Sequence, residues 1–135
     1  MGAISTSDVV AVAEFRASLR SFLRRSERIA RRSGLTPQRH LLLLMIKGAP
    51  DGSEQSTVTE LAERLQLAQS TVTELVSRAE NAGLVARAQS QTDARVAYLR
   101  LTPEGERRLA DAFTDLSSER DQLRAAVAHL DGTLA

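Results

Sequence analysis

One short segment of the chain concentrates hydroxyl and amide side chains at the start of an expected helix. Its apolar residues recur at helical spacing, so the polar ones share the opposite, outer face. Hydroxyls and amides near a helix N-terminus can bond phosphates or base edges with help from the helix dipole, although ordinary capping and solvation would also account for them. The candidate side chains of this segment are Gln69, Ser70, Thr71, Thr73, Ser77 and Arg78.

Three charged side chains near this segment could take part in the same chemistry. Arg95 follows a polar loop at 88–94, where a guanidinium can enter the narrow minor groove of an A·T tract. Asp93 is expected to orient or pair with an arginine rather than to meet nucleic acid. Glu74 places an acid on the outer face of the helix, where it either accepts a hydrogen bond from cytosine N4 or weakens binding to a polyanion. Both alternatives for Glu74 stay open.

Two short helices joined by residues 66–68 are expected to hold the hydroxyl-rich segment. The first begins at a capping box, in which Thr57 is the N-cap and Glu60 lies three residues on. The second ends near Asn81, and Gly83 supplies its C-terminal stop. Two short helices joined by so brief a turn form a helix-turn-helix.

The periodicity changes from helical to alternating after Gly83. Residues 84–87 and 96–101 have the apolar pattern of two strands around the loop at 88–94. A β-hairpin that directly follows a helix-turn-helix is a wing. The sequence therefore predicts a mainly α fold with a small two-stranded β wing, in which residues 36–101 form a winged helix-turn-helix domain.

Longer helices are expected on both sides of this unit. Residues 8–33 carry an apolar seam with alternating spacings of three and four, and a helix of that length, roughly 39 Å, is too long for so small a domain to cover. A second chain is its natural partner. Residues 41–46 are all apolar and leave the expected helix over 37–47 little polar face, which predicts a central helix. A closing helix over 103–130 either continues through residues 117–119 or breaks there.

Composition and length exclude several classes of protein. The 135-residue chain is 42% hydrophobic, which predicts one domain over 1–135. It has no cysteine, and its two histidines, His40 and His129, are far apart, so no metal site is expected. Because it lacks a Gly-rich phosphate loop and a nucleophile elbow, we expect neither an enzyme nor a cofactor. No leader or membrane-length apolar stretch is found, which predicts a soluble cytoplasmic protein without membrane contact.

The positive charge of the chain is concentrated in its first third. Residues 1–49 contain nine Arg and Lys against three Asp and Glu, whereas 50–101 contain five against seven and 102–135 four against seven. An Arg-rich segment can meet phosphates, but it can equally be a solvated helix face. The sequence leaves both interpretations of the basic segment open.

The order of the expected elements resembles that of the MarR family of winged helix-turn-helix transcriptional regulators. The resemblance covers residues 19–130, and its order and spacing are more specific than any one motif. The most specific part is residues 93–95, Asp-Ala-Arg, followed by 101–105, Leu-Thr-Pro-Glu-Gly. The other matching segments are Leu35-Thr36-Pro37-Gln38, Glu60-Leu61-Ala62 with Gln69-Ser70-Thr71-Val72-Thr73, and Gly83-Leu84-Val85 with Arg87.

The resemblance implies a homodimer assembled from dimerisation helices 8–33 and 103–130. Each subunit would place one helix in the major groove of double-stranded DNA and its wing along the backbone or minor groove. A two-fold dimer requires a near-palindromic operator with half-sites roughly 34 Å apart, and repression is the expected outcome. A winged-helix interaction or dimerisation module that has lost DNA binding is the alternative, which Glu74 and the near-neutral helix-turn-helix leave open.

The resemblance further implies a small aromatic or anionic effector. Such a ligand would bind in a cleft between the dimerisation and DNA-binding regions and weaken operator affinity. The sequence offers four candidates on or near the helices that would line the cleft, each of which could instead serve packing or solvation: Arg16, Arg20, Phe22 and His40. Release of DNA would require the ligand to favour one spacing of the recognition helices over another.

Overall fold

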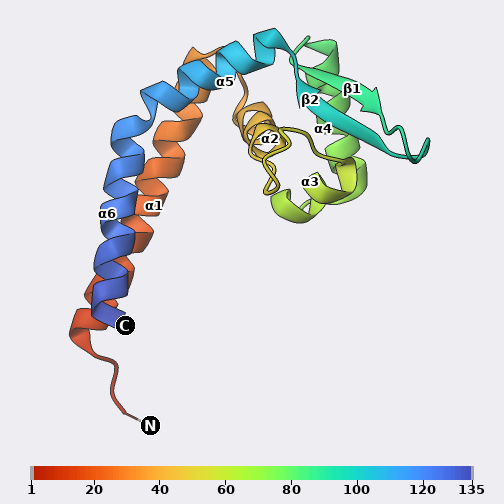
Figure 1. The fold of residues 1–135 in the computed structure, drawn as a ribbon. Coiled ribbons are helices and arrows are strands. Elements are labelled where there is room, and N and C mark those ends of the chain that lie inside the picture. Colours follow the sequence, from red (N-terminus) through yellow and green to blue (C-terminus); the bar gives the residue numbers. More distant parts are fainter. Residues whose placement is uncertain (1, 135) are drawn as a thin grey trace.

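The computed structural model describes residues 2–134, which form helices and one β-hairpin (Figure 1). Met1 and Ala135, the two ends of the predicted domain, lie outside the described residues. The predicted fold class, mainly α with a two-stranded wing, is confirmed. In chain order the elements are α1 (Thr6–Arg32), α2 (Pro37–Lys47), α3 (Val58–Leu65), α4 (Gln69–Asn81), β1 (Val85–Gln89), β2 (Ala97–Leu101), α5 (Pro103–Asp115) and α6 (Ser117–Leu134).

Local signals in the sequence set the ends of the first two helices. Helix α1 begins at Thr6, two residues before the expected start, because the carbonyl of Ser5 already accepts the first helical bond from Val9, at 3.1 Å. It ends before Gly34, whose φ of 75° suits a residue without a Cβ. Thr36 then caps α2 by accepting from the backbone N–H of Arg39 at 3.1 Å.

The helix-turn-helix forms where the sequence predicts it. The capping box at the start of α3 is reciprocal: Glu60 N–H donates to the Thr57 hydroxyl, and Thr57 N–H donates to the Glu60 carboxylate, both at 3.2 Å. Gln66 takes a left-handed conformation with φ 57° and turns the chain into α4. One apolar core joins α2, α3, α4 and the base of the wing, and its fully buried side chains include Leu42, Leu43, Ile46, Leu61, Val72, Val76, Leu84 and Leu99.

The wing is an antiparallel hairpin whose first strand is longer than expected. Val85 pairs with Leu101 at its base and Gln89 pairs with Ala97 at its far end. The prediction ended the first strand at residue 87, but the small side chain of Ala88 and the polar one of Gln89 continue the ladder. The hairpin loop is therefore shifted along the chain rather than shortened: it begins after Gln89 instead of at Ala88, and β2 begins at Ala97 rather than at Val96.

The closing helical region breaks into two helices, which is the second of the two alternatives that the sequence left open. The break falls at Leu116, between α5 and α6. Leu116 is buried together with Ile29 and Ala112, which anchors the turn, and Arg120 donates to the carbonyl of Phe113 at 2.6 Å. Helix α6 continues beyond the predicted end at residue 130.

Helices α1 and α6 lie side by side and form a two-helix arm that projects from the rest of the molecule (Figure 1). Helix α5 connects this arm to the wing, with α2 beneath it and α3 and α4 on the far side. Both ends of the described chain lie near the tip of the arm. Among residues 2–134, no helix is both long and apolar enough to cross a bilayer.

Candidate nucleic-acid interface

Helix α4 divides into a buried apolar face and an exposed polar face. Val72, Leu75, Val76 and Ala79 are turned into the core. Every polar residue that the sequence singled out on this helix is exposed: Gln69, Ser70, Thr71, Thr73, Glu74, Ser77 and Arg78. The structure therefore gathers these candidates on one face of α4. An α-helix with its side chains is about 10 to 12 Å across, which matches the width of a DNA major groove.

The N-terminus of α4 differs from those of α2, α3 and α5. Threonine side chains, Thr36, Thr57 and Thr102, cap those three helices. Helix α4 starts after Ala68, which has no side-chain oxygen, and no side chain caps it. Its first-turn N–H groups are therefore left to solvent or to an anion.

Glu74 is paired within its own helix. The guanidinium of Arg78 donates to its carboxylate at 2.5 Å, one helical turn away, and both side chains are about 60% exposed. Glu74 and Arg78 are the charged side chains on the exposed face of α4, so their pairing leaves this face without net charge. Solvent screens so exposed a pair, and its contribution to folding stability is small.

Arg95 lies at the wing tip, where its side chain is 90% exposed. Its backbone N–H and guanidinium donate to the Asp93 carboxylate at 3.0, 3.2 and 3.3 Å. These bonds hold the pKa of Asp93 below its usual value. The prediction that Asp93 orients an arginine is confirmed.

A second arginine ties the wing to α4. Arg87 on β1 bonds Glu80 on α4 through two guanidinium nitrogens, at 3.2 and 2.8 Å, and Glu80 raises its pKa. Sequence reasoning gave Arg87 no role of its own and missed Glu80. The pairing depends on how a strand packs against a helix, and no spacing in the chain signals it. The contact fixes the wing relative to α4.

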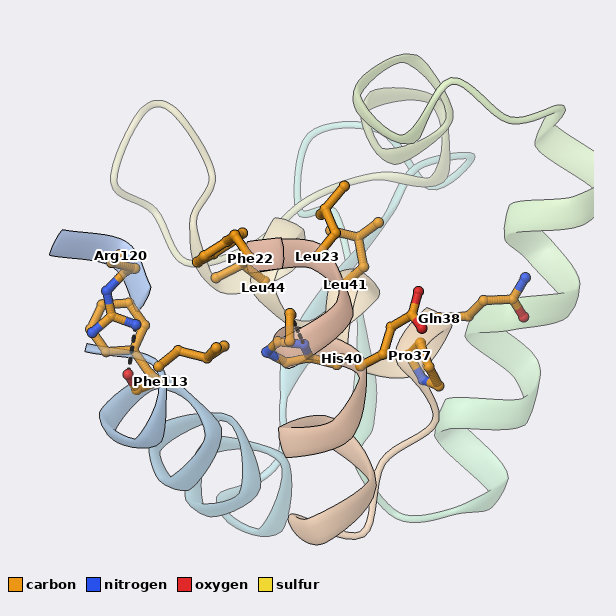
Figure 2. A pocket seen from close by; sticks show the side chains of 12 residues that line it. Phe22, Leu23, Pro37, Gln38, His40, Leu41, Leu44, Phe113 and Arg120 are labelled. Carbon is orange, nitrogen blue, oxygen red and sulfur yellow. Dashed lines mark hydrogen bonds between the residues drawn. The ribbon is translucent and has the colours of Figure 1, made fainter. Parts of the chain in front are cut away.

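A cavity of about 330 Å³ opens at the base of the arm, lined by α1, α2, α5 and α6 (Figure 2). Phe22 and His40, two of the four candidate effector residues, line it. Arg16 and Arg20 do not, because they line a separate groove on α1. The cavity wall is mostly apolar, and its other lining residues are Leu23, Ser26, Glu27, Pro37, Gln38, Leu41, Leu44, Phe113, Leu116 and Arg120.

Two nitrogen-bearing side chains are placed in this wall. His40 is buried, which lowers its pKa, and its Nδ1 lies 3.5 Å from the hydroxyl of Ser26. The Arg120 guanidinium lies 3.7 Å above the ring of Phe113 (Figure 2). Sequence reasoning missed Arg120, because only the break at Leu116 turns it toward α2. In the part of the chain that the structure describes, no three His, Asp or Glu side chains form a group suited to a metal ion.

Residues 33–96 match a family model described as MarR family. The matched segment contains α2, α3, α4, β1 and the hairpin loop, and it ends just before β2. No curated protein matches the chain by sequence. The family resemblance expected from the order of the elements is thus confirmed.

Solved structures share the fold beyond the matched segment. A MarR family transcription regulator is 25% identical, with a TM-score of 0.69 over 84% of this chain and 72% of that chain. MarR from E. coli in its apo form is 18% identical, with a TM-score of 0.71 over 98% and 96%. A variant of E. coli MarR complexed with operator DNA is 19% identical, with a TM-score of 0.70 over 88% and 86%.

Proposed function

From the match of residues 33–96 to the MarR family model, we propose that the chain is a homodimeric regulator of transcription that binds double-stranded DNA. The observation that carries the proposal is the exposed polar face of α4 together with the exposed guanidinium of Arg95 at the wing tip. The operator-bound E. coli MarR, which has the same fold, supports it. The role proposed is binding, not catalysis, in the cytoplasm.

In this proposal α4 enters the major groove and the wing follows the backbone. Hydroxyls and amides at the start of α4 bond phosphates and base edges, helped by the uncapped helix N-terminus. Arg95 reaches the minor groove, with Asp93 limiting its rotamers. The Arg87–Glu80 pair keeps the two contact points at a fixed separation.

A second copy of the chain is the proposed partner of the arm. Large apolar side chains stay exposed along one side of the arm and its base: Val12 at 43%, Leu23 at 53%, Leu41 at 43% and Phe113 at 51%. Covering them removes apolar surface from water. Helices α1, α5 and α6 are the proposed dimerisation helices, and two-fold symmetry then calls for a near-palindromic operator, whose occupation represses transcription.

The arm yields a direct test of the dimer. Leu23→Glu places a charge among the exposed apolar side chains of the arm. Sedimentation should then show a monomer, or a mixture of monomer and dimer that depends on concentration. Leu67→Glu, at a comparably exposed leucine on the helix-turn-helix, is the matched control and should leave the dimer intact. A wild-type protein that is monomeric at micromolar concentration contradicts the proposed assembly.

The cavity is the proposed effector site. Phe22 and Phe113 offer aromatic surface, while Arg120 and the His40 ring offer polar contacts, a combination suited to a small aromatic anion. Because Leu23, Leu41 and Phe113 both line the cavity and remain exposed, a second copy would also close over its mouth. Binding there weakens DNA affinity only if the ligand favours one spacing of the two α4 helices.

DNA binding is tested by selection from a pool of genomic fragments in a salt series. We expect one near-palindromic sequence, whose affinity falls as salt rises because phosphate contacts release counterions. Arg95→Ala should weaken binding and lower the slope of log K against log salt by about one. Arg124→Ala, which removes an equally charged and exposed side chain on the arm, should change neither. Selection of nothing at low salt would instead support an interaction module without DNA binding.

A further inference from the structure

Glu74 occupies the middle of the exposed face of α4. At about 100° per residue, its side chain points roughly 150° away from the mean direction of the buried residues Val72, Leu75, Val76 and Ala79. It also lies one turn after Ser70, on the same line along the helix. A helix that places this face in the major groove therefore directs the Glu74 carboxylate at base edges rather than at phosphates.

The carboxylate keeps acceptor capacity after it binds Arg78. Arg78 bonds one of its two oxygens, and a carboxylate offers about four lone-pair positions. The ion pair at 2.5 Å also restricts the Glu74 rotamer and offsets repulsion from the polyanion. Glu74 can thus approach bases as an oriented acceptor. Because its charge is balanced by Arg78, the pair as a whole is not repelled by the DNA.

Major-groove chemistry then decides which base it tolerates. Guanine presents two acceptors at this edge, and thymine presents an acceptor and a methyl group, so neither offers a donor to a carboxylate. Adenine presents a donor beside the N7 acceptor, whereas cytosine presents its N4 amino group without a neighbouring acceptor. Cytosine is therefore the base whose edge best complements Glu74, and the donors of Arg78 suit a guanine nearby.

We infer that Glu74, oriented by Arg78, is a specificity-determining residue that selects cytosine at one position of each operator half-site. This inference rests on the proposed DNA-binding function. It assigns to the acidic residue a discriminating role, in place of a purely unfavourable one. Glu74 then adds no affinity for random sequence, and its contribution is the rejection of the wrong base.

The experiment compares wild-type protein with Glu74→Gln on a randomised duplex pool. Wild type should require one cytosine per half-site and discriminate against other bases there by about ten- to a hundredfold. Glu74→Gln should shift that preference to adenine, because an amide bonds both N6 and N7 of adenine. It should also bind random DNA more tightly at low salt. Glu14→Gln, the same change on the arm, should alter neither property.

The two proposals fail in different ways. If Glu74→Gln selects the same base at every position as wild type, the inference is overturned while DNA binding stands. If wild type retains no DNA at low salt, the proposed function fails first and the inference with it. Because Glu74 and Arg78 are both about 60% exposed, a thermal melt should show that the variants remain folded.

Discussion

Gly105 offers the sharpest test of how α5 is seated on the wing. It is buried in the first turn of α5, and a Cβ built on it would lie 2.2 Å from the carbonyl oxygen of Leu84. That carbonyl cannot retreat freely, because it accepts a hydrogen bond from the backbone of Thr102 at 3.0 Å. To restore even a 3.0 Å contact, the helix and the wing base must separate by about 0.8 Å.

Gly105→Ala should therefore destabilise the protein, although alanine favours helix. Overpacking costs about 1–3 kcal/mol, and it outweighs a helix-propensity gain of about 0.5–1 kcal/mol. The matched control is Gly132→Ala on α6, where a Cβ meets nothing within 4 Å, so only the gain remains. At about 4 °C per kcal/mol, Tm should fall for Gly105→Ala and rise by about 2–4 °C for Gly132→Ala.

The assay is thermal unfolding by circular dichroism, with urea titration to obtain the free energy of unfolding. Because both variants carry the same substitution in a helix, their difference isolates the contact with Leu84. Equal stability of the two variants would refute the reasoning, since it would mean that α5 moves away from the wing without cost.

Three further substitutions test the caps and the titrating groups. Ala68→Ser adds the missing cap of α4 and should raise the free energy of unfolding by about 1 kcal/mol in urea titration; no gain would mean that those N–H groups are already satisfied. Burial lowers the pKa of His40 below 6.5, so stability should be full above pH 6.5 and fall as pH drops below it; His40→Gln should flatten this slope. Arg107 and Arg108 lower the pKa of Glu104 from 4.5 to about 2, so its contribution is present above pH 4.5 and lost toward pH 2; a Glu104→Gln variant with an unchanged acid slope contradicts this.

Elements that carry their own start and stop signals could be predicted from the sequence. Thr36 and Thr57 cap their helices as expected, and Gly34 ends α1. The sequence allowed the closing helix either to continue through residues 117–119 or to break there, and it could not decide between the two. The outcome, a break at Leu116, depends on burial of that side chain with Ile29 of another helix.

The candidate site divides in the same way. Helical periodicity was enough to place the polar residues of α4 on one exposed face. It could not show that Glu74 is paired with Arg78 rather than free, since either rotamer fits an i,i+4 spacing. The residues of the cavity, which come from different helices, were harder still to predict: the candidates Arg16 and Arg20 lie outside it, and Arg120 was missed.

The contacts of α5 determine how a ligand in the cavity could change the placement of α4 and the wing. Its C-terminal half contributes Phe113 to the cavity wall, while its first two turns contact three other parts of the molecule. Arg108 donates to the carbonyl of Gly34 at 2.8 Å, Lys47 at the end of α2 bonds Glu106 at 3.0 Å, and Gly105 packs on the wing base. A ligand that shifts Phe113 would thus move α5 as a rigid helix and displace the atoms that make these three contacts. Because they connect to the α1–α2 turn, to α2 and to the wing, such a shift would change the placement of the wing and, through Arg87 and Glu80, of α4.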